Sequence, residues 1–209
     1  MHTTSRPRGF TLIELIVTIA IVAILVTVLV VAINPAEQLS RSRDSKRISD
    51  LDALKTALNL YLAQATTTIN LSGNTPSANS GCIFQASSTL YLNTTGAVAT
   101  STVFGASTTI VRSTTTQAVG STGWMPARID QTPGGATVSV LPLDPTNGLG
   151  SGTTYFYYYL CDITGGVRNF ELGATLESTY FTSDLDLDGT DGGNESGRYE
   201  VGTDPALNL

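Results

Sequence analysis

An apolar run near the N-terminus limits what this chain can fold into. Residues 15–33 are interrupted only by Thr18 and Thr27. As a helix rising ~1.5 Å per residue, such a run is ~29 Å long, which matches the hydrocarbon core of a bilayer. A secretory signal peptide is the alternative, but its apolar region is usually ~7–15 residues long, and residues 30–32 form a poor small-residue cleavage site. We therefore predict a membrane-spanning helix.

Composition excludes several classes of enzyme. His2 is the only histidine of the 209 residues, so a mature chain trimmed at its N-terminus has no Ser-His-Asp triad, Cys-His pair or histidine-ligated zinc. Lys46 and Lys55 follow no phosphate-binding glycine loop, and the glycine cluster at 148–152 lacks the dinucleotide fingerprint. Residues 48–209 carry five Lys or Arg against fourteen Asp or Glu. This balance does not provide the basic surface that nucleic-acid binding requires. We expect no catalysis and no specific nucleic-acid binding.

The apolar run begins with a specific motif. A short basic leader ends in Gly9, and the chain then reads Phe10-Thr11-Leu12-Ile13-Glu14. An acid at the centre of a bilayer costs ~2.5–3.5 kcal/mol, and less toward the interface, so we expect Glu14 to have a partner. A snorkelling interfacial glutamate is the alternative. The segment resembles the class III leader of type IV pilins and of the pseudopilins of type II secretion systems.

This resemblance implies processing and polymerisation. In this family a prepilin peptidase cuts after the glycine, here between Gly9 and Phe10, and methylates the new N-terminal residue. The family's glutamate, here Glu14, pairs with the N-terminal amine of a neighbouring subunit in a helical homo-oligomeric filament, and two such charges buried in an apolar bundle must pair. The leader would be cytoplasmic, and the chain after Ile33 would lie outside the inner membrane as a single-pass protein. Its other partners would be a membrane assembly platform, a cytosolic ATPase and minor pilins or pseudopilins.

Periodic apolar residues predict that the helix continues over residues 34–65. They are spaced by three and four, and they are Ile48, Leu51, Leu54, Leu58, Tyr61, Leu62 and Ala65, with Asp50, Asp52, Lys55 and Asn59 opposite. This face must pack on something, which we predict to be a sheet. Asn34-Pro35 separates the two helical parts and predicts a kink, because proline removes a backbone hydrogen bond.

The sequence from residue 66 onward predicts an irregular region followed by a sheet. Residues 66–135, rich in Thr, Ser, Gly and Ala, predict loops with one or two short strands, and Trp124 is expected to fill the core. The predicted strands of an antiparallel sheet are 137–141, 153–160 and 167–176, with glycine turns at 148–152 and 165–166. Tyr155, Tyr157 and Tyr159 share one strand face, which we interpret as a packed face rather than a binding platform.

These observations predict an α+β fold, in which a long N-terminal helix packs on a small antiparallel sheet in the lollipop form of pilins. We divide the chain into a cleaved leader (1–9), a transmembrane and filament-core helix (10–33), an amphipathic continuation (34–65), a Thr/Ser-rich region (66–135) and a sheet with an acidic segment (136–209).

Cys82 and Cys161 are the only cysteines. In an extracytoplasmic domain two cysteines predict one disulfide. It would close a loop of roughly 80 residues and stabilise the fold by at most ~4–5 kcal/mol in the chain-entropy model. Two free buried thiols are the alternative.

An acidic segment near the C-terminus has the spacing of a calcium loop. Residues 184–195 read D-x-D-x-D-G, with a glutamate after five more residues. The proposed ligands are Asp184, Asp186, Asp188, a backbone carbonyl near Thr190, and Glu195. Gly189 would permit the sharp turn. A calcium site here also resembles major secretion pseudopilins, and an ordinary acidic turn is the alternative.

The resemblance implies a structural filament subunit, and two kinds of filament fit. The calcium loop and the segment Leu141-Pro142-Leu143-Asp144-Pro145 resemble the major pseudopilin of a type II secretion system, which secretes proteins. The long Thr/Ser-rich region instead favours a surface type IV pilus used for adhesion, motility or DNA uptake. A membrane-anchored, calcium-dependent binding module is an alternative from another class.

Overall fold

The structure is a computed structural model of the whole chain, and it divides into two compact units, Met1–Leu39 and Ser40–Leu209. We describe each unit by itself. The residues that the structure describes are 9–64, 70–71, 82–85, 100–101, 108–113, 115–147, 155–162 and 168–206.

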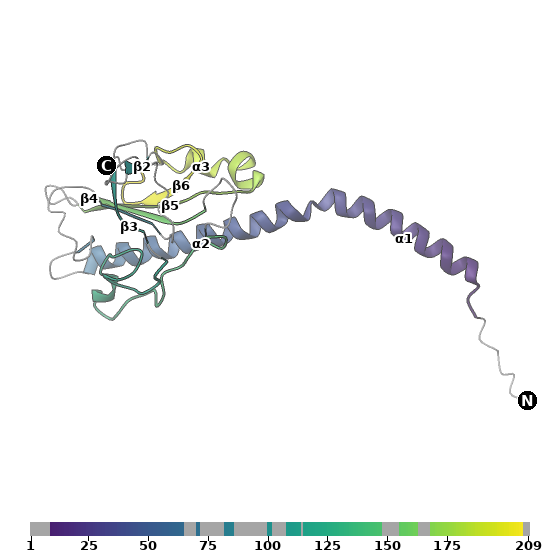
Figure 1. Ribbon diagram of the computed structural model, residues 1–209, viewed down its shortest axis with the longest axis horizontal. Helices are drawn as coiled ribbons and strands as arrows, with labels where there is room; N and C mark the ends of the chain where they lie inside the picture. Colours follow the sequence, from purple (N-terminus) through teal and green to yellow (C-terminus); the bar gives the residue numbers. More distant parts are fainter. Residues whose placement is uncertain are drawn as a thin grey trace, which may run out of the picture. The chain divides into compact units, whose positions relative to one another are not determined.

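The main element of the first unit is helix α1 (Leu12–Ile33; Figure 1). By length and composition its segment Leu12–Val30 can cross a membrane, as the apolar run predicted. The helix ends at Ile33 because Asn34 adopts a left-handed conformation with φ 45°. Pro35 then begins helix α2 (Pro35–Gln64), since a proline is tolerated in the first turn of a helix.

In the second unit, α2 lies along one face of a sheet (Figure 1). Its buried residues recur every three or four positions, and they are Asp44, Arg47, Leu51, Leu54, Ala57, Leu58 and Tyr61. The predicted apolar face is therefore confirmed at Leu51, Leu54, Leu58 and Tyr61. Ile48 and Leu62 are half-buried, and Ala65 lies outside the described residues.

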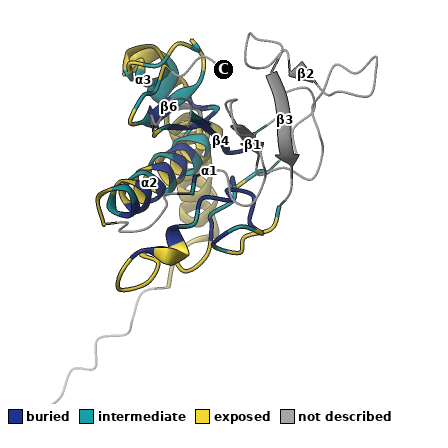
Figure 2. Ribbon diagram, turned by 90° about the vertical axis from the view of Figure 1, so that its left-hand side faces the viewer, coloured by how far each residue is buried: buried dark blue, intermediate teal, exposed yellow. Residues whose placement is uncertain are grey.

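Three antiparallel strands form the part of the sheet that α2 covers. They are β4 (Tyr158–Asp162), β5 (Asn169–Ala174) and β6 (Tyr199–Gly202), hydrogen-bonded in that order. Tyr159, Phe170 and Leu172 belong to one hydrophobic core with Leu54 and Leu58 of α2. Figure 2 shows buried segments in both the helix and these strands. The predicted α+β fold class, a helix packed on a small antiparallel sheet, is confirmed.

Three further strands widen the sheet, where the sequence predicted only one or two. β1 (Cys82–Gln85) pairs antiparallel with β4, β3 (Thr108–Ser113) pairs parallel with β1, and β2 (Thr100–Ser101) pairs antiparallel with β3. The strand order is β2-β3-β1-β4-β5-β6. These strands are held by pairing with neighbours along the sheet, β1 with β4, β3 with β1 and β2 with β3, which the local sequence pattern does not specify.

The strand predicted at residues 137–141 was wrong, because this segment is irregular. The backbone N–H of Leu141 donates to the carbonyl of Gln117 at 2.9 Å, and the Gln117 side-chain amide donates to the Leu141 carbonyl at 2.9 Å. A neighbouring loop therefore satisfies this backbone instead of a strand. Val140 is 53% exposed, so the alternation marks no buried face.

The other two predicted strands are shifted or shortened. The strand predicted at 153–160 begins later, at Tyr158, and the strand predicted at 167–176 is β5. The two predicted glycine turns lie outside the described residues. Trp124 is fully buried and donates from Nε1 to the Pro142 carbonyl at 3.0 Å, which confirms it as a core residue.

The aromatic strand is buried on both faces. Tyr157 and Tyr159 lie in the core with α2, and Tyr158 is equally inaccessible on the other face. Each hydroxyl donates a hydrogen bond: Tyr157 to Asp50 (3.0 Å), Tyr158 to Glu200 (2.7 Å) and Tyr159 to the Leu71 carbonyl (3.2 Å). The tyrosine rings therefore fill the interior while their hydroxyls are hydrogen-bonded, as the packed-face interpretation predicted.

Candidate functional site

Gly9 and Phe10 lie just before α1, outside regular secondary structure. A Cβ atom added to Gly9 would meet nothing within 4 Å, and its φ is not in the left-handed range. Phe10 is 91% exposed. Neither packing nor backbone conformation in the first unit therefore requires a glycine followed by a phenylalanine here. Residues 1–8 of the predicted leader lie outside the described part of the chain.

Thr11 and Glu14 form a capping box at the start of α1. Glu14 Oε2 accepts hydrogen bonds from the backbone N–H and the hydroxyl of Thr11, both at 2.9 Å, and the Glu14 N–H donates to Thr11 Oγ1 at 3.3 Å. This arrangement satisfies free N–H groups of the first turn, and a carboxylate there also complements the helix dipole. The sequence analysis counted Thr11 in the leader motif but did not predict its role as a helix cap, although T-x-x-E before an apolar run is the sequence signature of such a cap.

The Glu14 carboxylate keeps one oxygen for another partner. Both bonds from Thr11 end on Oε2, and Oε1 accepts no hydrogen bond from the residues that the structure describes. The glutamate can therefore cap its own helix and accept from an ammonium at the same time. Its pairing with the amine of a neighbouring subunit stays a prediction.

The side chains of α1 are open to their surroundings along the whole apolar segment. Within Leu12–Val30 none is buried inside the first unit, and Leu12 and Leu25 are 75% and 64% exposed. An apolar surface of this extent on a single helix needs lipid or other helices around it. The first unit therefore has the properties of a membrane anchor.

The acidic segment follows β5 and ends before β6. Asp184 is the last residue of the π-helical turn η4 (Tyr180–Asp184), and Asp188 and Thr190 lie in the short helix α3 (Leu187–Thr190). Asp186 precedes α3 with a left-handed φ of 50°, and Glu195 lies in the turn that leads to β6. The five predicted ligands are therefore spread over two helical turns and a loop.

The expected role of Gly189 was wrong in one respect. Gly189 lies inside α3 and has no positive φ, and the left-handed positions are instead Asp186 and Gly192. A Cβ on Gly189 would lie 2.5 Å from Oδ1 of Asp186. The glycine thus leaves room for the aspartate carboxylate instead of making the turn itself.

The ligand atoms proposed in this segment are of a chemical type that suits a hard cation. All predicted ligands are oxygens, which calcium prefers. Burial, followed by the charges of Asp186 and Asp191, raises the pKa of Asp188 above its ordinary value, so these carboxylates are close enough to repel. Within the described residues, which include all of 184–195, no three carboxylate, cysteine or histidine side chains are grouped as metal ligands. Calcium binding therefore stays a prediction.

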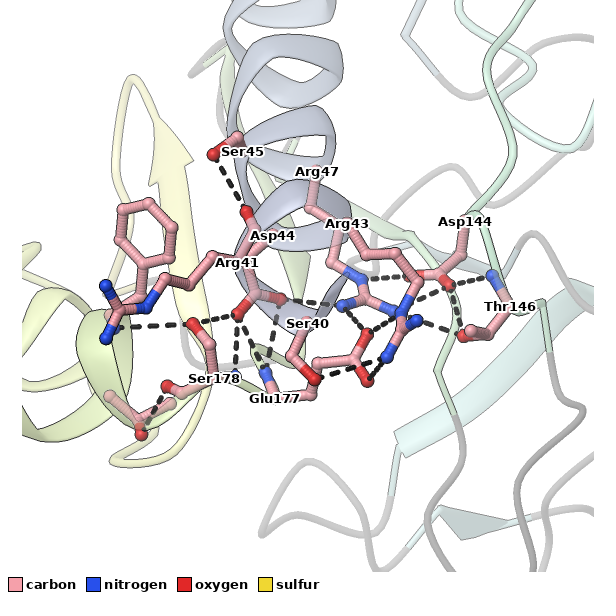
Figure 3. A network of polar contacts seen from close by, with 12 residues as sticks. Ser40, Arg41, Arg43, Asp44, Ser45, Arg47, Asp144, Thr146, Glu177 and Ser178 are labelled. Atoms are coloured by element: carbon pink, nitrogen blue, oxygen red, sulfur yellow. Dashed lines mark hydrogen bonds and ion pairs between the residues drawn. The ribbon is translucent and has the colours of Figure 1, made fainter. Parts of the chain in front are cut away.

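The second unit contains a buried ion cluster that the sequence analysis missed (Figure 3). Arg47 donates to Asp144 through Nε (2.6 Å) and Nη2 (3.0 Å), and through Nη1 to Asp44 and Glu177 (2.6 Å each). Arg43 donates to Glu177 through Nε (2.7 Å) and Nη2 (2.6 Å). The cluster joins α2 to the loop before β4 and to the segment after β5.

The remaining atoms of this cluster are also satisfied. Asp44 Oδ2 accepts from the backbone N–H and the hydroxyl of Ser178, at 2.8 and 2.6 Å. Burial opposes ionisation of Asp144, but hydrogen bonds and charge from Arg47 outweigh it, so the pKa of Asp144 lies below its ordinary value. The pKa of Glu177 is lowered in the same way: burial opposes ionisation, and Arg43 and Arg47 outweigh it.

One sequence signal could have revealed the cluster. Arg47 stands four residues before Leu51 and seven before Leu54, so it continues the apolar stripe of α2. A charge on a buried stripe needs an ionic partner, because an unpaired buried charge is very costly. The identity of that partner could not be predicted, since Asp144 is distant in the sequence.

The cysteines lie on neighbouring strands. Cys161 of β4 is disulfide-bonded, and the chain has one other cysteine, Cys82, which is its register partner on β1. The bond therefore ties the Thr/Ser-rich region to the sheet.

Comparison with known proteins bears on the N-terminus. Residues 4–30 match the family model described as the prokaryotic N-terminal methylation motif. The match covers Gly9, Phe10, Glu14 and most of α1, and it supports a type IV pilin-like N-terminus with a class III leader. No curated protein and no solved structure matches the chain.

Proposed function

We propose that this chain, which carries the methylation motif of type IV pilin-like proteins, is the structural subunit of a pilus-like filament. The observation that carries the proposal is the register of the motif on the structure. Gly9-Phe10 directly precedes the capped start of an apolar helix, and Glu14 lies in the first turn of that helix. The capping of α1 explains only in part why Glu14 is present, and no packing contact explains why residue 9 is a glycine.

Processing by a prepilin peptidase would release Phe10 as a methylated N-terminus. The apolar helices, which have no cover within their own unit, would then leave the membrane and bundle in the filament core. The second unit has its own hydrophobic core and would form the outside of the filament on the far side of the inner membrane. A membrane platform, a cytosolic ATPase and minor subunits would drive assembly, and the subunit itself would catalyse no reaction.

Among such filaments we favour the major pseudopilin of a type II secretion system. The acidic segment 184–195 and the segment 141–145 support this choice through their resemblance to that group. In this chain the second segment holds Asp144, whose pairing with Arg47 gives it a role in the fold. The three strands within residues 66–135 favour instead a surface type IV pilus, because they enlarge the head.

The experiment is mass spectrometry of the protein purified from its host, with electron microscopy of sheared cell-surface and periplasmic fractions. We expect an intact mass that corresponds to a chain starting at Phe10 with one added methyl group, and filaments that contain this chain. A chain that starts at Met1, or near Ile33, would contradict the proposal and favour a membrane-anchored binding module or a secreted protein. Filaments found in the sheared cell-surface fraction, and not in the periplasmic fraction, would favour the surface pilus over the secretion pseudopilin.

A further inference from the structure

Three residues form a row across the sheet, on the face that points away from α2. Tyr158 of β4 is the register partner of Gly173 on β5, and Gly173 is the register partner of Glu200 on β6. A Cβ atom on Gly173 would collide with the Tyr158 ring, so the glycine lets this ring cross β5. The Tyr158 hydroxyl therefore reaches β6 and donates to Oε1 of Glu200 at 2.7 Å.

The buried side chain of Glu200 also bonds to the acidic segment. Its second carboxylate oxygen, Oε2, accepts the backbone N–H of Glu195 at 3.0 Å. A Cβ atom on Gly193 would collide with the same oxygen, so a glycine at this position lets the segment approach the strand. Glu200 thus joins the aromatic strand β4 to the backbone of the acidic segment.

Asp191 of the acidic segment bonds to the strand in return. Its Oδ2 accepts the backbone N–H of Glu200 at 2.5 Å, and its Oδ1 accepts the N–H of Gly193 at 2.9 Å. N–H groups alternate in direction along a strand, and the Thr203 N–H, three positions on, donates to the Phe170 carbonyl of β5 at 3.0 Å. The Glu200 N–H therefore points away from β5, and a side chain takes the place of a neighbouring strand as its acceptor.

Each of the four carboxylate oxygens of Asp191 and Glu200 accepts a hydrogen bond from a neutral donor of this chain. Such bonds to an ionised acceptor are roughly twice as strong as those between neutral groups. In the described part of the chain, which includes all of 184–195, no three side chains are grouped as metal ligands. The contacts that hold this segment on the sheet therefore come from the chain itself.

We propose that these contacts fix residues 191–195 on the sheet without a bound cation. Asp191 and Glu200 are then positioning residues, because they hold the backbone of Glu195, the last ligand of the predicted calcium loop. A segment that is ordered in advance loses less conformational entropy when a ligand binds. The proposal goes beyond the proposed function and does not depend on filament formation.

Amide hydrogen exchange, measured by NMR on the full chain in detergent micelles with a calcium chelator, tests this proposal. We expect the N–H groups of Glu195 and Glu200 to exchange many-fold more slowly than those of an unstructured chain. The Thr203 N–H, which bonds on the β5 side, reports opening of the sheet as a whole. Unprotected Glu195 and Glu200 in chelator, with protection only after calcium is added, would overturn the proposal.

Substitutions separate positioning from general stability. Glu200→Ala removes the acceptor of the Glu195 N–H and should speed its exchange at least several-fold, with little change at Thr203. Glu200→Gln should restore most of this protection, because the amide oxygen can accept the Glu195 N–H while the amide nitrogen donates to the Tyr158 oxygen. Asp188→Ala is the matched control, since it removes a carboxylate of the same segment that takes no part in these contacts. Unchanged exchange at Glu195 in Glu200→Ala, or equal acceleration by Asp188→Ala, would overturn the proposal.

Discussion

Arg47 and Asp144 form a bidentate ion pair, with Nε to Oδ2 at 2.6 Å and Nη2 to Oδ1 at 3.0 Å, and neither side chain is accessible to solvent. Burial of two charges is costly unless their remaining hydrogen-bonding groups are also satisfied. Here Nη1 of Arg47 donates to Asp44 and Glu177 as well. The pair therefore holds α2 at one position against the loop before the sheet.

Replacing Arg47 by Met should strongly destabilise the second unit, because Asp44 and Asp144 would stay buried without a cation. We expect a loss of ~3–5 kcal/mol in the free energy of unfolding. Urea unfolding followed by the fluorescence of Trp124, the only tryptophan and fully buried, measures this loss. The matched control is Arg128→Met, which removes a partly exposed pair with Asp130 and should cost ~0–1 kcal/mol. Equal losses in the two variants would contradict the role of the cluster.

The same cluster predicts loss of stability in acid. The pKa values of Asp144 and Glu177 are lower in the folded chain than their ordinary values of 3.8 and 4.5. The folded state thus binds fewer protons, so the stabilisation is complete above the ordinary pKa and disappears as the pH falls through the folded pKa. We expect a melting temperature that is nearly constant near neutrality and falls below about pH 4.

Asp144→Asn is the control for that pH dependence. It should lower the melting temperature at neutral pH and reduce the further fall in acid. An acid-induced fall as large as that of the unaltered protein would show that other groups are responsible.

Reduction of the disulfide should destabilise the second unit. The loop between Cys82 and Cys161 is roughly 80 residues long, and the chain-entropy model gives at most ~4–5 kcal/mol for it. Urea unfolding with and without a thiol reductant should show a lower midpoint in the reduced protein. A variant with alanine at both positions should unfold at that lower midpoint and should not respond to the reductant.

Calcium should stabilise the protein if residues 184–195 bind it. Extracellular calcium modules have Kd values of ~10⁻⁴–10⁻³ M. A ten-fold excess over Kd would add ~1.4 kcal/mol, so the melting temperature should rise with calcium and fall with a chelator. Asp186→Ala should abolish the difference, whereas Asp52→Ala, an exposed carboxylate of α2, should preserve it. Magnesium should substitute poorly, because it requires a tighter octahedral shell.

Identical melting curves with calcium and with chelator would leave this segment an ordinary acidic turn. That result would also remove the main support for a secretion pseudopilin over a surface pilus.

The two roles of Glu14 can be separated by substitution. Glu14→Gln keeps the capping box, since glutamine serves at this position, but it removes the charge that would pair with a neighbouring ammonium. We expect both Glu14→Gln and Glu14→Ala to insert in the membrane and to form few or no filaments by electron microscopy. Thr18→Ala is the control, because the Thr18 hydroxyl only bonds back to the Leu15 carbonyl at 2.8 Å. Normal filaments from Glu14→Gln would show that Glu14 only caps its own helix and that its charge is not needed for assembly.

The local sequence pattern was sufficient to predict the two N-terminal helices, α1 and α2. The apolar run, the break at Asn34-Pro35 and the stripe through Leu51 and Leu58 each depend on residues within a few turns of one another. The processing motif is also local, so it could be recognised without a structure. Side chains three or four apart share a helix face whatever the rest of the chain does.

Tertiary structure decided what lies far apart in the sequence. The alternation at residues 137–141 resembled a strand, but the loop that contains Gln117 took its hydrogen bonds. β1 became a strand beside β4 and β3 became a strand beside β1, and Arg47 acquired Asp144 across 97 positions. Long-range pairing depends on which groups the fold brings together, and no local period encodes it. The sequence by itself therefore determined the anchor, the processing motif and the buried face of α2. Only the fold decided the extent of the sheet and the partners in the buried ion cluster.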